Sequence, residues 1–486
     1  MGLWWPRLGV GMGAYPYKYK YKMPEAPHRS YGQPRRLPSS GRDPEKGDSS
    51  VLPHETILGI GIGLGISGLS ALIPGLHPYN LVAVVTFGLQ WEWWSFPEDL
   101  GLGLGVGVAV GYAFFHLAPA VFYQTPDEGA AGLLLPAQKA LREGWALEAV
   151  WWSAWGAWGA VLAMLLSAVL WPRGWATFRA VLTPHMSWLL LAIVAFMLLS
   201  EWPWGYERLP NPLQRLQAVW LRLGAGLLTF GLSGLLGVLL LSRNPLHGPL
   251  AHQPLLPAFL GLFAVPGLMQ GVWGSRPSRV CAPSEPLTFG IWARGMGAGI
   301  LGGAFAVIFP GVTAGIGGLL AGHATAQRDD RAFLVSQGAA RALYVIGSFW
   351  LLTIPDAPTT RGGLSGMLAP WVGPATPSRF QTVVWATGLA GAVAFGLLGP
   401  MAQRMQVWSM NPAWRWVYGA ALGLILISIG LLGGFPAICA LLAATGLGWL
   451  PILTGSRRLN TLGVILIPLL LRRFGLEATA IQALDL

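Results

Sequence analysis

The sequence carries little charge. Asp, Glu, Lys and Arg make up 10% of its 486 residues, whereas 53% are hydrophobic. An ordinary soluble domain carries about a quarter charged residues, so this composition cannot cover a soluble globule of this size. The hydrophobic residues are also too many for one buried core. The composition therefore argues against a soluble enzyme and against disorder, and it indicates a polytopic membrane protein.

Cysteine is scarce, and familiar catalytic motifs are absent. Cys281 and Cys439 give neither a disulfide framework nor a metal cluster, and we expect both to be small packing residues. No His-Glu-x-x-His or Gly-x-Ser-x-Gly motif occurs, and the eight histidines are scattered. The glycines at alternate positions from Gly101 to Gly107 lack the Lys-Ser/Thr of a phosphate-binding loop and suit close helix packing instead. We expect no catalytic site, no metal and no cofactor.

Long uncharged stretches are abundant, for example over residues 56–91, 100–126, 223–242 and 416–456. Because these stretches are continuous, they favour helices over the alternating strands of a β-barrel. Membrane helices also tolerate the 67 glycines and 38 prolines. We predict an all-α polytopic membrane protein with about 10 to 13 transmembrane or half-helices. The stretch 416–456 is too long for one helix, and we expect it to divide near Gly433–Gly434.

Residues 1–55 differ from the rest of the chain. They contain nine Lys and Arg residues and no hydrophobic run long enough for a signal peptide. We predict a disordered basic tail in the cytoplasm, because positive charge marks the cytoplasmic side of a membrane protein. Met1 and Met23 are both candidates for the true start. The net charge of +11 then reflects topology and contact with anionic lipid, and we expect no nucleic-acid partner.

Two distant segments share an unusual pattern. Pro74–Gly75 and Pro310–Gly311 each lie within a Gly-rich apolar run, 236 residues apart (310 minus 74). A Pro-Asp pair follows each of them, at Pro126–Asp127 and Pro355–Asp356, with an offset of 229 residues (355 minus 126). The similar offsets predict a duplicated unit.

The duplication predicts two membrane repeats, residues 56–250 and 251–486, each with a helix broken by Pro-Gly. A broken helix leaves backbone groups unsatisfied in the bilayer, where each costs several kcal/mol unless protein, water or ligand satisfies it. The N-terminal ends of half-helices attract anions, and unwound carbonyls suit Na⁺. Paired breaks in two repeats therefore indicate a transporter site near the membrane midplane, with a packing kink that touches no ligand as the alternative.

Three stretches of the chain carry a further pattern. They are residues 68–80 (Gly-Leu-Ser-Ala-Leu-Ile-Pro-Gly-Leu-His-Pro-Tyr-Asn), 125–150, which begin Thr-Pro-Asp-Glu, and 450–468, which end Gly-Val-Ile-Leu-Ile-Pro. Together they resemble the large permease subunit of tripartite tricarboxylate transporters, and are most similar to the branch typical of archaea. The resemblance covers residues 56–475. At residues 137–139 the chain has Ala-Gln-Lys where that branch has Gly-His-Arg, so no role of that histidine is carried over.

The resemblance implies an ion-coupled secondary transporter, a symporter, for small carboxylates such as di- and tricarboxylates. Such a permease is a multi-pass protein in the lipid bilayer of a prokaryotic plasma membrane, with Na⁺ or H⁺ as the coupling ion. Classical members work with a small membrane subunit and an extracytoplasmic binding protein, whereas members of the archaeal-type branch look able to occur alone. This chain reveals neither partner, and a homo-oligomer is also compatible with it.

The candidate substrate-binding residues lie at the two breaks and just before the first Pro-Asp pair: Pro74, Gly75, His77, Asn80, Thr125, Pro310, Gly311 and Thr313. Asp127 and Glu128 follow a long uncharged run, and we predict that they couple the ion, because carboxylates in a membrane are costly and usually functional. The alternatives give these residues no role in transport. The two acids would face water in a loop, His77 would satisfy a backbone carbonyl, and Thr313 would bond within its own helix.

Two charged residues of the second repeat allow two interpretations. Asp356 follows its proline as Asp127 does, but its flanks resemble a loop. Arg341 borders an apolar segment, where it either clamps a carboxylate with two N–H groups or extends to the membrane surface.

Two other functions compete with transport. A scaffold or lipid-interacting membrane protein would explain the Trp and Arg content but not the repeat. An intramembrane enzyme would need a catalytic set that the sequence lacks.

Overall fold

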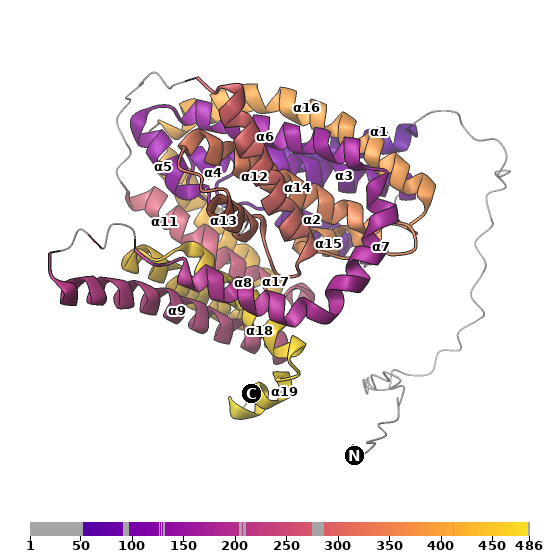
Figure 1. The fold of residues 1–486 in the computed structure, drawn as a ribbon. Helices are drawn as coiled ribbons and strands as arrows, with labels where there is room; N and C mark the ends of the chain where they lie inside the picture. The colour runs from indigo at the N-terminus through magenta and orange to yellow at the C-terminus, as the bar shows by residue number, and fades with distance from the viewer. Residues whose placement is uncertain are drawn as a thin grey trace, which may run out of the picture. The chain divides into compact units, whose positions relative to one another are not determined.

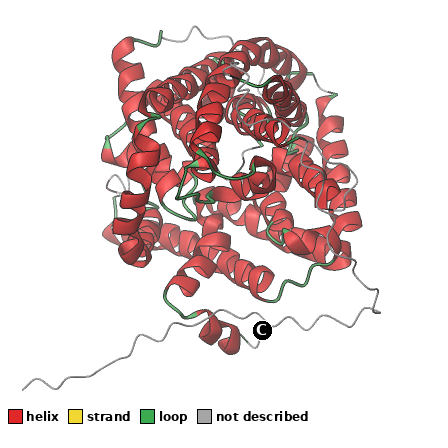
Figure 2. Ribbon diagram, turned by 90° about the vertical axis from the view of Figure 1, so that its right-hand side faces the viewer, coloured by secondary structure: helices red, strands yellow, loops and turns green. Residues whose placement is uncertain are grey.

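The computed structural model describes residues 52–90, 97–125, 127, 129, 132–203, 207, 210–274, 286–411 and 413–484. Most of the predicted N-terminal tail, Cys281 and Glu128 lie outside these residues. All described elements are helices (Figure 2). Ten helical segments of the described chain are long and apolar enough to cross a membrane. These findings confirm the predicted all-α polytopic membrane fold.

Figure 1 follows the helices along the chain. The first half contains α1 (His54–Leu72), α2 (Pro78–Gln90), α3 (Glu98–Phe115), α4 (Leu117–Phe122), α5 (Leu134–Glu143), α6 (Ala146–Ser167), α7 (Leu170–Leu182), α8 (Met186–Leu199), α9 (Pro212–Ser242), α10 (Leu256–Phe259) and α11 (Val265–Trp273). The second half contains α12 (Phe289–Ile308), α13 (Ala314–Ala324), α14 (Asp330–Thr353), α15 (Gly362–Val372), α16 (Pro377–Ser409), α17 (Trp414–Thr454), α18 (Gly463–Arg473) and α19 (Glu477–Ala483). Short turns of 3₁₀ or π-helix lie between them: η1 (Thr183–His185), η3 (Gly248–His252), η4 (Leu260–Ala264) and η5 (Arg458–Leu462). Gly434 has non-helical backbone angles inside α17, which confirms the predicted division of that stretch.

Helices α1 and α3 run parallel, with their backbones in contact. A Cβ atom built on Gly59 would lie 2.3 Å from the carbonyl oxygen of Leu100, and one built on Gly63 would lie 2.4 Å from that of Leu104. From the other side, a Cβ on Gly103 would come within 2.1 Å of an α1 carbonyl oxygen. Only glycine permits this approach. The packing role expected for the α3 glycines is therefore confirmed at Gly103.

The chain reverses direction at Pro74–Gly75. Because α1 and α3 point the same way, the intervening α2 must return, and α1 and α2 form a hairpin whose tip is residues 73–77. Gly75 has a φ of +75°, a conformation that side chains with a Cβ rarely adopt. A Cβ there would also lie 2.7 Å from the Leu268 side chain of α11. The predicted break is thus the turn of a hairpin.

The second half repeats this arrangement. A Cβ on Gly295 of α12 would lie 2.6 Å from the carbonyl oxygen of Ala332 in α14, and one on Gly303 would lie 2.9 Å from that of Ala340, so α12 and α14 are also parallel. Between them α13 returns, and the hairpin tip is residues 309–313. At this tip the glycine of the second Pro-Gly pair has a φ of +77°.

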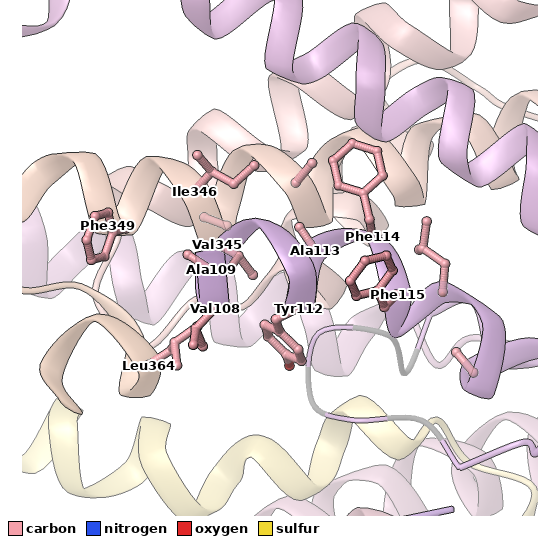
Figure 3. Close-up of a cluster of buried hydrophobic side chains, with 14 of the residues drawn as sticks. Val108, Ala109, Tyr112, Ala113, Phe114, Phe115, Val345, Ile346, Phe349 and Leu364 are labelled. Atoms are coloured by element: carbon pink, nitrogen blue, oxygen red, sulfur yellow. The ribbon is translucent and has the colours of Figure 1, made fainter. Parts of the chain in front are cut away.

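The long third helices of the two halves, α3 and α14, run antiparallel. Gly105 of α3 packs against Phe349 of α14, while Tyr112 packs against Arg341, so the numbering rises along one helix as it falls along the other. Figure 3 shows the buried apolar side chains where these two helices meet, among them Val108, Ala109, Ala113, Val345 and Ile346. The two halves therefore have opposite orientations. The predicted boundary between the repeats at residue 250 stays a prediction.

The other helices pack either on this central pair or on one another. α6 packs on α14 and α16 packs on α3, whereas α17 packs on α10 and α11, and α9 packs on α18. Helix α11 covers the first hairpin tip, since its Leu268 lies at Gly75. Helix α18 covers the second, since its Leu469 lies at Gly311. Leu221 of α9 and Leu431 of α17 are 75% and 82% exposed, as expected of surfaces that face lipid.

Candidate functional site

An ion pair joins the two halves beside the first hairpin tip. Arg341 Nη1 donates to Asp127 Oδ1 at 2.9 Å, and Arg341 Nη2 donates to Asp127 Oδ2 at 2.7 Å. Two N–H groups thus meet two carboxylate oxygens in the bidentate geometry that is specific to arginine. The two side chains are only 3% and 10% exposed. Asp127 belongs to the loop after α4, and Arg341 to the middle of α14.

This ion pair lies deep within the helices. Arg341 comes eleven residues after the start of the 24-residue α14, or about 16 Å along a helix of about 36 Å. Tyr112 lies against it, with the Arg341 guanidinium 4.3 Å from the centre of the phenol ring. Because both ends of α14 are distant, the pair sits near the middle of the spans.

A chain of hydrogen bonds connects the first hairpin tip to Asp127. The backbone N–H of Tyr79 donates to His77 Nδ1 at 3.2 Å, so the proton of a neutral His77 lies on Nε2. Nε2 is 2.7 Å from the Tyr112 hydroxyl, which in turn donates to Asp127 Oδ2 at 2.8 Å. His77 Nε2 itself lies 3.7 Å from the same carboxylate oxygen. His77 therefore donates to Tyr112, and Tyr112 donates to the Asp127 carboxylate.

A second histidine lies beside this chain. His116 Nε2 is 3.0 Å from Ser70 Oγ, and Ser70 Oγ donates its own proton to the carbonyl oxygen of Ser67 at 2.9 Å. Since the serine hydrogen is used, His116 donates to Ser70. The His116 ring lies 5.9 Å from the His77 ring, between centroids.

A small cavity opens between these groups and the π-helical turn η4. Its volume is about 50 Å³, and its polar lining consists of Ser70, His77, Tyr79, Asn80, His116, Thr125 and Asp127. A water molecule needs roughly 10–15 Å³ by this measure, so the cavity has room for a few waters or a hydrated cation. Asn80 Oδ1 is buried and accepts no hydrogen bond within the described chain. A carboxylate substrate needs a wider opening than this conformation provides.

The second hairpin reaches the same ion pair from the other side. A Cβ atom built on Gly129 would lie 3.4 Å from Asp127 Oδ1, 3.6 Å from Arg341 Nη1 and 3.9 Å from Ala314 Cβ. Ala314 is the first residue of α13, directly after the second Pro-Gly turn. Both hairpins therefore border the Asp127–Arg341 pair.

A family model, that of the tripartite tricarboxylate transporter TctA family, matches residues 56–463. The match spans both hairpins, both long central helices and the whole ion-pair site. The chain belongs to this family. Membership in the TctA family implies a tricarboxylate transporter permease, a multi-pass membrane protein that works as part of a tripartite system. No curated protein and no solved structure matches the chain.

The predicted site residues of this TctA-family chain fall into three groups. Gly75, His77, Asn80, Thr125 and Asp127 line the cavity, and buried Pro74 lies next to it in the first hairpin tip. Pro310, Gly311 and Thr313 form the second tip and do not line the cavity. Glu128 lies outside the described residues. Their functional roles stay predictions.

Sequence reasoning missed part of the site. Ser70 and Tyr112 lie within apolar helices, His116 lies between α3 and α4, and only the fold brings the three side chains close to Asp127. Of the two interpretations of Arg341, its geometry is that of a guanidinium that binds a carboxylate with two N–H groups, and this carboxylate is that of Asp127. In the described residues no group of three His, Cys, Asp or Glu side chains is placed to hold a metal ion.

Proposed function

We propose that this chain is an ion-coupled permease for small carboxylates, with Arg341 as the group that binds a substrate carboxylate. The observation that carries the proposal is the bidentate Asp127–Arg341 pair between the two hairpins. In this pair the protein's own carboxylate takes the position that a substrate carboxylate would take. Binding of substrate at Arg341 therefore requires Asp127 to leave.

The release of Asp127 links the substrate to a cation. A buried carboxylate that loses its arginine partner is costly in a low-dielectric site. Neutralisation of Asp127 by H⁺ or Na⁺ removes that cost, so the cation and the anion enter together. This competition gives symport without a direct contact between the two ligands.

The hydrogen-bond chain favours H⁺ as the coupling ion. His77 and Tyr112 form an unbroken path from the cavity to Asp127 Oδ2. When His77 takes up a proton, it can pass its Nε2 proton to the Tyr112 hydroxyl, which passes its own proton to the carboxylate. The next turn of the cycle then needs each hydrogen bond to regain its original direction. Na⁺ would instead use the cavity oxygens, including Asn80 Oδ1.

The test is uptake of radiolabelled citrate into proteoliposomes under a pH gradient or a Na⁺ gradient. We expect the pH gradient to drive uptake by the wild type. The Asp127→Asn variant replaces the carboxylate with an uncharged amide of the same shape, and its uptake should no longer depend on either gradient. Asp330→Asn, which changes an exposed aspartate of α14, is the matched control and should retain coupled uptake. Gradient-dependent uptake by Asp127→Asn would contradict the role of Asp127.

We also propose that the protein belongs to the archaeal-type branch of the family and lies in a prokaryotic plasma membrane with a cytoplasmic N-terminus. A small membrane subunit, an extracytoplasmic binding protein and further copies of the chain are the proposed partners. Co-purification from native membranes, followed by mass determination of the complex, tests all three. We infer no enzymatic activity, because the TctA family is a transporter family.

A further inference from the structure

A buried glutamine of α14 has an unused hydrogen-bond donor. Gln337 is 5% exposed, and its Nε2 has no hydrogen-bond partner within the described chain. Nearly all buried polar side chains of folded proteins have such a partner, because a buried amide without one costs free energy. The unused donor of Gln337 therefore needs an explanation, and a ligand that accepts its hydrogen bond would supply one.

Gln337 lies one helical turn before Arg341. Residues four apart on an α-helix lie on the same face, with their Cβ atoms about 6 Å apart. The loop that carries Asp127 runs along this face of α14. A Cβ built on Gly129 would lie 3.6 Å from Arg341 Nη1, and one built on Gly132 would lie 3.0 Å from Gln337 Oε1. The same loop therefore covers both side chains.

Helix α13 passes both side chains. Its first residue, Ala314, lies beside Arg341, because Ala314 Cβ and Arg341 Nη1 are 3.9 and 3.6 Å from the same Cβ position built on Gly129. One turn further along α13, a Cβ built on Gly318 would lie 2.9 Å from Gln337 Oε1. The two side chains thus lie along a single strip between α13 and α14.

The start of α13 favours a negative group at this strip. In the first half, α2 also begins just after a hairpin tip, and His77 Nδ1 accepts the N–H of Tyr79 there at 3.2 Å. The Thr313 side chain forms no such cap at the start of α13. The first N–H groups of a helix have no partner within the helix and carry partial positive charge. An anion beside Arg341 would therefore also be attracted by α13.

We propose that Gln337 binds a second carboxylate of the transported substrate, next to the carboxylate that Arg341 binds, and so selects substrates with two or more carboxylates. This inference rests on the proposed function, in which Asp127 leaves Arg341. The same movement draws Gly132 away from Gln337, whose Nε2 then donates to the substrate. Succinate and citrate carry carboxylates separated by a few carbon atoms, a spacing comparable with one turn of an α-helix.

The experiment measures thermal unfolding of the purified full-length protein with added succinate, butyrate or citrate. Succinate and butyrate share a four-carbon chain, but butyrate has a methyl group in place of the second carboxylate. For the same shift, the wild type should need about tenfold less succinate than butyrate, because succinate gains one charge-assisted hydrogen bond. Gln337→Leu should lose this preference and respond to butyrate as the wild type does. Gln403→Leu, which changes an exposed glutamine of α16, is the matched control and should keep the preference.

Two further readouts separate binding from a structural role. Without ligand, Gln337→Leu should unfold at the wild-type temperature or above, because it removes a buried donor that has no partner, whereas a structural role predicts a lower temperature. Gln337→Glu places a negative charge where the second carboxylate would bind. Its response to succinate should be weaker than that of Gln337→Leu, because like charges repel each other in a buried site.

Other outcomes overturn the inference in distinguishable ways. A succinate preference that persists in Gln337→Leu overturns the role of Gln337 and leaves the proposed function standing. Equal weakening of the succinate and butyrate responses in that variant shows a structural role and overturns the inference as well. A wild type that prefers butyrate would keep carboxylate binding at Arg341 but overturn the selection of a second carboxylate. If the wild type responds to none of the three acids, the proposed function fails.

Discussion

The two halves of this protein use one frame for opposite charges. In each half a glycine-lined helix packs in parallel on a long helix, reverses at Pro-Gly, and leaves a tyrosine facing the loop that follows. In the first half this loop places Asp127 at Tyr112, and the carboxylate is fully paired. In the second half the corresponding loop carries Arg361, next to the Gly362 that packs against the Tyr344 hydroxyl, and its Asp356 is exposed. The difference shows that a duplicated helical frame can keep its geometry while its loops take on different chemistry.

Removal of one arginine from each half should show this difference most clearly. Arg341→Gln leaves Asp127 buried without its partner, and we expect the free energy of unfolding to fall by about 3–5 kcal/mol. Arg361→Gln should cause no comparable loss. Thermal unfolding of both variants in the same detergent measures the contrast. The double variant Asp127→Asn/Arg341→Gln should recover much of the loss, and equal losses in the two single variants would refute the comparison.

The two tyrosines offer a milder contrast. Tyr112→Phe removes a hydrogen bond to a buried charge, which is worth about 1.5–3 kcal/mol. Tyr344→Phe should cost less, because Asp356, the counterpart of Asp127, is exposed. Chemical denaturation of the two variants gives the values, and uptake by Tyr112→Phe should also lose its dependence on pH. A larger loss from Tyr344→Phe would reverse the assignment.

The hairpin tips should instead respond alike. Gly75→Ala and Gly311→Ala both place a Cβ on a left-handed backbone, at a cost of about 1–2 kcal/mol each. Both also crowd a leucine, at 2.7 Å in α11 and 2.8 Å in α18. Similar losses of unfolding temperature would sharpen the view that the frame is shared. A loss at only one tip would show that the frame itself has diverged.

The smallest effect is expected at a surface contact between the halves. Lys139 Nζ of α5 lies 2.5 Å from Asp330 Oδ2 at the start of α14, and both are exposed. Lys139→Ala should cost about 0.2–1 kcal/mol. The hydrogen bond with Asp330 raises the pKa of Lys139. Its contribution is therefore complete at neutral pH and is lost as pH rises above about 10.4, the ordinary value, which unfolding measurements between pH 7 and 11 can follow.

Much of the fold could be predicted because the bilayer constrains it. Uncharged runs indicate helices, and a Pro-Gly or Gly-Gly pair inside such a run indicates where a helix can break, because proline lacks an N–H and glycine tolerates positive φ. The breaks at Pro74–Gly75 and in α17 could therefore be predicted. The reversal of the chain at residues 73–77 could not be predicted, because a kink in a continuous helix and a turn between two helices can have the same local sequence. It follows from the parallel packing of α1 and α3, which is a contact between distant segments.

The site was predictable in part for the same reason. His77, Asn80 and Asp127 stand out as polar residues beside apolar runs. Tyr112 and His116 do not, because an amphipathic aromatic within an apolar helix looks like packing. Arg361 could not be singled out either, since it lies in a loop and alone resembles an interfacial residue.

The antiparallel course of α3 and α14 has a consequence for how the chain enters the membrane. One and the same hairpin-and-helix unit sits in the bilayer in both orientations within a single polypeptide. The unit is therefore stable in both orientations, and its own helices do not determine the orientation in which it inserts. That decision falls to the Lys and Arg residues of the connecting segments, which are read during insertion. The helices determine the architecture, and a few basic residues between them determine its direction.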